Sequence, residues 1–151
     1  MDFYSNNIYK RMAEKLSLIR DNKECIFTPN LLSGKIIERY NCFYFESLAP
    51  KYTKAFSMDF DHTENECSYN KIFIGSIIEG ESKEQKFECG IFFAQKLAEK
   101  LLTEFGTGFN VIFSFDMENS FVRFHKIRDG ERWLKDDLES YKMDAILKIV
   151  V

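Results

Sequence analysis

The stretch 82–115 constrains the fold of this chain most strongly, because a helix pattern leads there directly into a strand pattern. Ser82 and Gln85 have the spacing of a capping box, and apolar residues then recur about every 3.6 residues until Gly106. Over 109–115 apolar residues occupy every second position, as in a strand that is buried on one face. The sequence therefore predicts a long amphipathic helix followed by a strand.

Weaker patterns predict further elements on both sides of this stretch. A stripe of apolar residues from Tyr4 to Ile19 indicates a helix, and Thr28-Pro29 resembles the start of a second helix. The polar stretch 61–68 is expected to be a loop. The remaining expectations are a helix over 28–40, strands at 42–45 and 56–60, a central strand at 72–78, a hairpin partner at 121–127, a short helix at 131–140 and a final strand at 145–151.

This order of elements predicts a single α+β domain over residues 1–151. The strands are mostly connected as hairpins, which favours a mixed or antiparallel sheet with helices packed mainly on one face. A chain of 151 residues is long enough for one core, and 45% of its residues are hydrophobic.

Charge and composition limit the classes of partner. The net charge of −3 disfavours direct nucleic-acid binding, which draws on an excess of Lys and Arg, and favours a cationic partner. The N-terminus lacks the pattern of a secretory signal, and no apolar run approaches the roughly 18 residues of a membrane span. We therefore expect a cytoplasmic protein that does not bind membranes. The four cysteines lack the close spacing of zinc or redox sites and are expected to be buried thiols.

The densest polar cluster lies at 59–67. It contains the carboxylates Asp59, Asp61, Glu64 and Glu66 without any Lys or Arg among them. Three interpretations remain open: a solvated loop, an anionic patch that faces a partner, or a metal site. The rival enzyme hypothesis is a metal-dependent hydrolase or nuclease that uses Asp59 and Asp61 with Asp116 or Glu118. The spacing of the cluster does not match a calcium-binding loop.

A second acidic cluster surrounds the single tryptophan, Trp133. Trp133 either anchors a short helix on the sheet or is an interface hot spot rimmed by acids. The candidate partner-binding residues in this cluster are Asp129, Glu131, Trp133, Asp136, Asp137 and Glu139.

The sequence contains no recognisable catalytic motif. His125 is expected on a strand surface rather than in a catalytic site, and Gly106-Thr107-Gly108 follows a helix, the reverse of the order in a phosphate loop. We therefore expect no catalytic residue, no bound metal and no cofactor. A module that binds a small ligand or peptide in an aromatic pocket is a further alternative.

The C-terminal stretch Arg128-Asp129-Gly130-Glu131-Arg132-Trp133-Leu134-Lys135-Asp136-Asp137-Leu138-Glu139-Ser140-Tyr141-Lys142 resembles small bacterial immunity proteins of polymorphic and contact-dependent growth-inhibition toxin systems. This resemblance implies a single-domain, cytoplasmic, non-catalytic inhibitor that binds and neutralises a cognate protein toxin. Many such toxins are nucleases with a cationic active cleft, which an acidic protein can cover. One of the two acidic clusters would then face the toxin.

Overall fold

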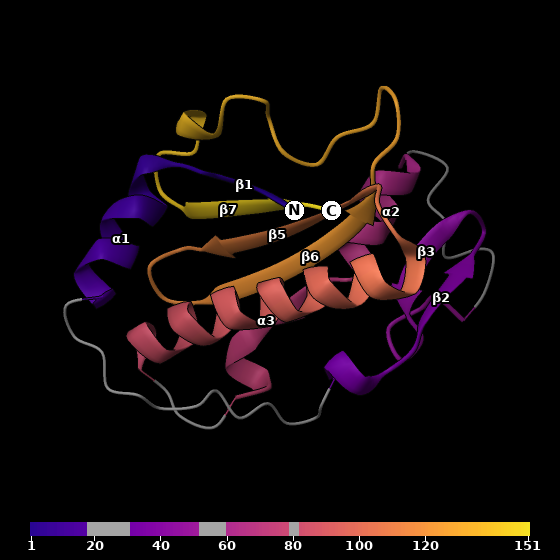
Figure 1. The fold of residues 1–151 in the computed structure, drawn as a ribbon, viewed down its shortest axis with the longest axis horizontal. Helices are drawn as coiled ribbons and strands as arrows, with labels where there is room; N and C mark the ends of the chain where they lie inside the picture. The colour runs from indigo at the N-terminus through magenta and orange to yellow at the C-terminus, as the bar shows by residue number, and fades with distance from the viewer. Residues whose placement is uncertain (18–30, 52–59, 79–81) are drawn as a thin grey trace.

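The computed structural model describes residues 1–17, 31–51, 60–78 and 82–151 (Figure 1). Strands β1, β7, β5, β6 and β4 form an antiparallel sheet in this order, and β2 and β3 form a separate hairpin. The fold is therefore α+β, as the sequence predicts. The elements are β1 (Asp2–Ser5), α1 (Asn7–Ser17), β2 (Ile36–Arg39), β3 (Cys42–Phe45), α2 (His62–Tyr69), β4 (Ile72–Phe73), α3 (Lys83–Phe105), β5 (Phe109–Phe115), β6 (Ser120–Lys126) and β7 (Ala145–Val150), with short 3₁₀ turns η1 (Leu31–Ser33), η3 (Ile74–Ser76) and η4 (Leu138–Ser140).

The helix, hairpin and final strand that the sequence predicts with the clearest patterns are confirmed. The Ser82 hydroxyl accepts a hydrogen bond from the Gln85 amide at 3.1 Å, and α3 ends at Gly106, which has a φ of 80°. In the hairpin β5 pairs with β6, and the Asp116 side chain accepts hydrogen bonds from two backbone amides in the turn. Strand β7 pairs with the other edge of β5.

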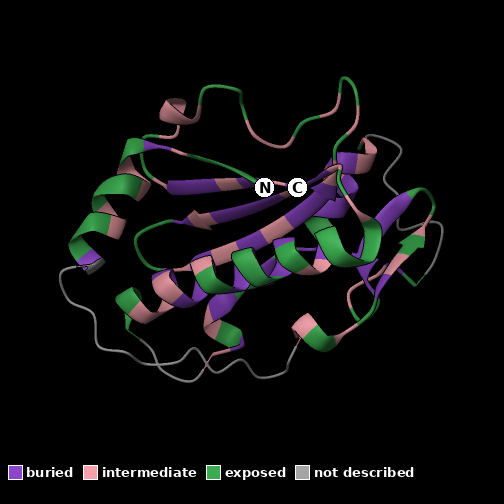
Figure 2. Ribbon diagram, in the orientation of Figure 1, coloured by how far each residue is buried: buried purple, intermediate pink, exposed green. Residues whose placement is uncertain are grey.

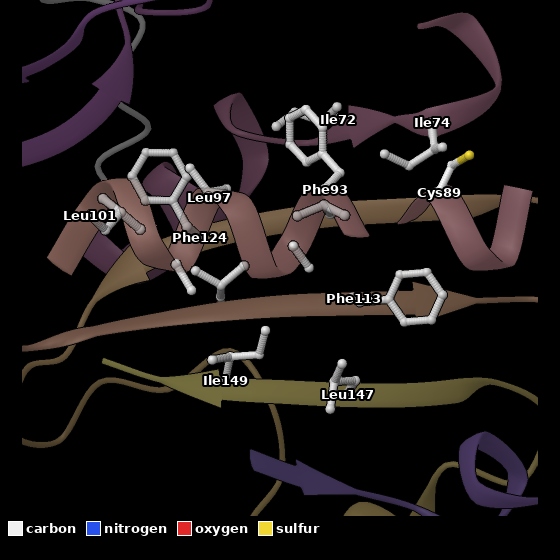
Figure 3. Packing of buried hydrophobic residues seen from close by; sticks show 14 of the residues in the cluster. Ile72, Ile74, Cys89, Phe93, Leu97, Leu101, Phe113, Phe124, Leu147 and Ile149 are labelled. Carbon is white, nitrogen blue, oxygen red and sulfur yellow. The ribbon is translucent and has the colours of Figure 1, made fainter. Parts of the chain in front are cut away.

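The hydrophobic core lies between the sheet and the two helices α1 and α3. Phe113 makes an edge-to-face contact with Phe87 of α3 at 5.3 Å, and it also contacts Tyr9 of α1 at 6.3 Å. Gly90 permits this close packing, because a Cβ atom there would lie 2.5 Å from the Phe113 ring. Figure 3 shows residues of α3, among them Phe93, facing core residues from the strands.

The N-terminal prediction is wrong at its first residues. Residues Asp2 to Ser5 form an edge strand that pairs with β7, and the helix starts only at Asn7. Asn6 makes the transition: its Oδ1 atom accepts hydrogen bonds from the Tyr9 amide at 3.0 Å and from the Ile146 amide at 3.1 Å. The strand depends on a partner at the other end of the chain, which a local apolar stripe does not reveal.

The predicted second helix is also wrong in its described part. Residues after η1 form the hairpin β2–β3, whose two turn residues, Tyr40 and Asn41, have φ values of 54° and 60°. Positive φ at both central residues is what a tight type I′ turn requires. The strand predicted at 42–45 is confirmed as β3. Thr28 and Pro29 lie outside the described residues.

Two other predictions differ from the structure, and a third lies mostly outside the described residues. The stretch 72–78 contains the short edge strand β4 and then turns away as η3, so it is not a central strand. The stretch 131–140 is irregular apart from η4. Of the strand predicted at 56–60, only Phe60 lies within the described residues, and it is in a bend.

The stretch 61–68, expected to be a loop, mostly belongs to helix α2. This helix lies between β3 and the end of β6, and several polar residues on it are buried. Asn70, directly after the helix, donates to the Phe43 carbonyl at 2.8 Å and accepts from the Phe45 amide at 3.2 Å. Asn70 thus provides hydrogen-bond partners for backbone groups on the edge of β3 that faces away from β2. No strand among the described residues pairs with this edge.

Two of the expected thiols are confirmed and one is not. Cys42 and Cys67 are free and buried, whereas Cys89 of α3 is disulfide-bonded. Burial raises the pKa of the Cys42 thiol, so it stays protonated near neutral pH. Among the described helices we find none with the length and apolar composition of a membrane span.

Candidate functional site

In the first acidic cluster, the described carboxylates mostly accept hydrogen bonds from other parts of the protein. Asp61 is the N-cap of α2: its Oδ1 atom accepts from the Glu64 amide at 2.7 Å, while Glu64 Oε2 accepts from the Asp61 amide at 3.0 Å. Asp59 lies outside the described residues. Asp61 and Glu64 therefore form a capping box, a helix-start signal that the expectation of a loop at 61–68 missed.

Glu66 cannot contact a partner, because its side chain is fully buried. Its carboxylate accepts hydrogen bonds from the Phe43 amide at 2.6 Å and the Lys126 amide at 2.8 Å. Arg128 donates to both carboxylate oxygens, at 2.9 and 2.8 Å, and also to the Asn41 carbonyl at 2.7 Å. The expectation that Glu66 faces a partner is therefore wrong. A buried carboxylate requires such donors, and here they tie α2 to both β3 and β6.

Glu131 joins the second acidic cluster to the first. One of its oxygens lies 3.0 Å from His62 Nδ1, and the other accepts from the Thr63 amide at 2.9 Å. Burial raises the pKa of the Glu131 carboxyl, but the hydrogen bonds from His62 and Thr63 outweigh it, so that the pKa lies below its usual value. Glu131, which lies in the segment after β6, thus binds the first two residues of α2.

The segment 127–144, which we call the β6–β7 loop, carries the remaining acids of the second cluster. Glu139 accepts a hydrogen bond from the Asn7 amide at 2.9 Å, and Asp137 accepts from the Glu139 amide at 3.0 Å. Asp136 pairs with Arg132 at 2.6 Å. Asp129, Asp136 and Asp137 are exposed, so this part of the predicted patch does face solvent (Figure 2).

Trp133 rests on the sheet face opposite α3. It is half-buried, and the Arg123 guanidinium of β6 lies 5.4 Å from its ring centroid. Two hollows of about 240 Å³ each lie between the sheet and the β6–β7 loop, and Trp133 and Leu134 line both of them. Of the two interpretations of Trp133 that the sequence left open, the structure agrees with packing on the sheet, but an irregular loop carries the residue rather than a helix.

The first hollow, the His125 cleft, has a polar floor. His125 and Asn110 stand opposite one another on β6 and β5, and Asn110 Nδ2 lies 3.3 Å from His125 Nε2. His125 Nδ1 lies 2.9 Å from the Lys126 carbonyl, which assigns the proton to Nδ1 and leaves Nε2 as an acceptor. The side chain is only 2% exposed, and burial lowers the pKa of His125. The expectation of a surface histidine is therefore wrong.

The second hollow, the Arg123 cleft, is lined by residues of both charges. Asp116 and Asp144 are among them, together with Arg123 and Tyr141. Burial and the neighbouring charge of Asp116 raise the pKa of the Asp144 carboxyl. The position of the β-turn at 116–119 fixes the register of the hairpin, so the sequence could have predicted that Asn110 lies opposite His125. No sequence pattern indicates that the β6–β7 loop folds back over these two residues.

The model of the family described as the uncharacterized protein PM0498 family matches residues 6–149. The chain belongs to this family. No curated protein and no solved structure matches the chain.

The rival hypothesis is that this PM0498 family member is a metal-dependent enzyme, and it can be compared with the carboxylates of the described residues. Within residues 1–17, 31–51, 60–78 and 82–151, no three His, Cys, Asp or Glu side chains form a group that could hold a metal ion. Asp116 accepts hydrogen bonds within the hairpin turn, and Glu118 pairs with Lys83 of α3. These two carboxylates therefore have structural partners.

Proposed function

We propose that this chain is a non-catalytic binding protein, specifically an immunity protein that binds and neutralises a cognate toxin through the β6–β7 loop. The observation that carries the proposal is that three exposed acids, Asp129, Asp136 and Asp137, lie on the same loop as the half-buried Trp133. An aromatic anchor rimmed by charge is a common composition for an interface hot spot. The loop also contains the stretch that resembles bacterial immunity proteins.

The charge of the loop favours a toxin with a cationic active cleft. Asp129 and Asp137 form no ion pair among the described residues, and Asp136 pairs only with the exposed Arg132. Exposed pairs of this kind are weak, so a positively charged partner can replace Arg132 at little cost. The buried Glu66 and the helix-capping Asp61 and Glu64 contribute little to such a surface.

The test begins with the reading frame that precedes the gene for this chain. The C-terminal domain of its product is expressed alone and together with this chain, and bacterial growth is measured. Growth arrest that this chain relieves, together with a complex seen by gel filtration, supports the proposal. Growth arrest without relief, or the lack of any toxic product, contradicts it.

A pair of charge-reversal variants then locates the binding surface. Changing Asp129, Asp136 and Asp137 to Lys is expected to weaken binding about tenfold or more and to reduce its salt dependence. The control changes Glu84, Glu99 and Glu104 to Lys, which alters the net charge equally on exposed positions of α3. Equal losses of affinity in both variants, measured by calorimetry, would place the interface elsewhere.

A further inference from the structure

The His125 cleft shares Trp133 with the proposed toxin surface and adds side chains that this surface does not use. Its walls include apolar side chains of Ile112, Ile127 and Leu134, and Trp133 closes one side. Arg123 lines only the Arg123 cleft and contacts Trp133 there, so the indole ring is held between the two hollows. A flat apolar group can therefore lie against a wall that is already fixed in place.

The side chains that line this cleft carry more positive than negative charge, because Arg132, Lys135 and Lys148 outnumber Glu131 and Asp136. Glu131 is held by His62 and Thr63, and Asp136 pairs with Arg132. Lys135 and Lys148 also line the cleft, and neither forms an ion pair with any described residue. The Lys148 ammonium instead lies over the ring of Tyr4, 4.9 Å from its centroid.

The floor adds directed hydrogen bonding to this charge. Only one of the two Asn110 Nδ2 hydrogens is needed for the contact with His125 Nε2, so the amide has a second donor. His125 is 2% exposed, and its contact with the Lys126 carbonyl fixes the ring. Cationic side chains and an amide donor around one hollow favour a carboxylate or phosphate group.

We propose that the His125 cleft binds a small anion attached to a flat ring, with the ring against Trp133 and the anionic oxygens near Lys135, Lys148 and Asn110. Aromatic carboxylates and nucleoside monophosphates share this chemistry. The cleft shares Trp133 and Asp136 with the proposed toxin surface but does not include Asp129 or Asp137, and the proposal does not rest on toxin binding.

Trp133 allows a direct test, because it is the only tryptophan of the chain. Its fluorescence, excited at about 295 nm where these ligands absorb little, is titrated with benzoate and benzamide and with adenosine 5′-monophosphate and adenosine. Each pair differs in whether the ring carries an anion. We expect a saturable change in which the anion of at least one pair binds about tenfold or more tightly than its neutral partner.

Matched variants assign the binding to the cleft. The double change of Lys135 and Lys148 to Met is expected to weaken binding of the preferred anion about tenfold or more. Changing Lys10 and Lys96 to Met removes the same charge from exposed positions of α1 and α3 and should leave the affinity unchanged. Circular dichroism verifies that both variants are folded. Absence of saturable binding, equal affinity for charged and neutral ligands, or equal losses in the two variants would overturn the proposal.

Discussion

The two acidic clusters look alike in the sequence, but the fold uses them differently. In the first cluster, Asp61 and Glu64 cap α2 and Glu66 is buried against Arg128. In the second cluster, Glu131 and Glu139 also accept internal hydrogen bonds, yet Asp129 and Asp136 remain exposed on the β6–β7 loop. A run of carboxylates therefore predicts a charged surface only where the backbone and cationic side chains around it leave the carboxylates free.

The largest expected effect that sharpens this comparison comes from Glu66. Changing Glu66 to Gln removes the buried charge beside Arg128 and places an NH2 group at the position of one carboxylate oxygen, where a backbone amide and Arg128 both donate. Breaking one side of a buried ion pair costs about 3 to 5 kcal/mol, so urea denaturation should show a loss of this size. Glu64→Gln is the control, because glutamine serves equally well in a capping box. Similar small losses in both variants would show that Glu66 is not essential to the fold.

A smaller effect is expected at Asp61. Changing Asp61 to Ala removes the side chain that caps α2 and should lower the free energy of unfolding by about 1 to 2 kcal/mol. Asp61→Asn keeps a capping oxygen and should remain within about 0.5 kcal/mol of the unchanged protein. If the alanine variant is as stable as the asparagine variant, the cap contributes nothing measurable.

Glu131 should make the stability depend on pH. Its folded-state pKa lies below the ordinary 4.5, so its contribution is fully present above that pH and is lost as the pH falls through the folded-state value. Changing Glu131 to Gln should cost about 1 kcal/mol at pH 7, because the contacts with His62 and Thr63 weaken. Denaturation between pH 7 and about pH 3 measures this, and the two proteins should converge at the acid end. A constant difference would contradict the assigned charge interaction.

The smallest effect on stability is expected at the exposed acids. Changing Asp129, Asp136 and Asp137 to Asn should alter the free energy of unfolding by no more than about 0.5 kcal/mol, since exposed charges contribute little and asparagine can still cap η4. Thermal denaturation of the triple variant measures the effect. A loss above about 1 kcal/mol would mean that these acids support the fold, as the first cluster does.

Local patterns were sufficient for about half of the fold. The capping box, the 3.6-residue period and the alternating strands predicted α3, the β5–β6 hairpin and β7, because each of these elements carries its own local pattern of residues. The same reasoning failed at β1, whose partner Val150 is at the far end of the chain, and at β2, where the tight turn at Tyr40 and Asn41 replaced a helix.

The candidate site was predicted only in part. The acidic residues near Trp133 were picked out from the sequence, and packing of Trp133 on the sheet was one of two interpretations, whereas the two hollows were not predicted. They exist because the β6–β7 loop folds back over strand residues that its own pattern does not specify. Irregular loops have no period from which such contacts could be read.

By itself, the sequence determined the α+β class, the main helix with its hairpin, and which residues carry negative charge. The tertiary structure decided which of those charges reach the surface. A carboxylate is buried or exposed according to the donors that surround it, and those of Glu66 come from Phe43, 23 positions before it, and from Lys126 and Arg128, 60 and 62 positions after it. Such long-range contacts leave no periodic signal along the chain.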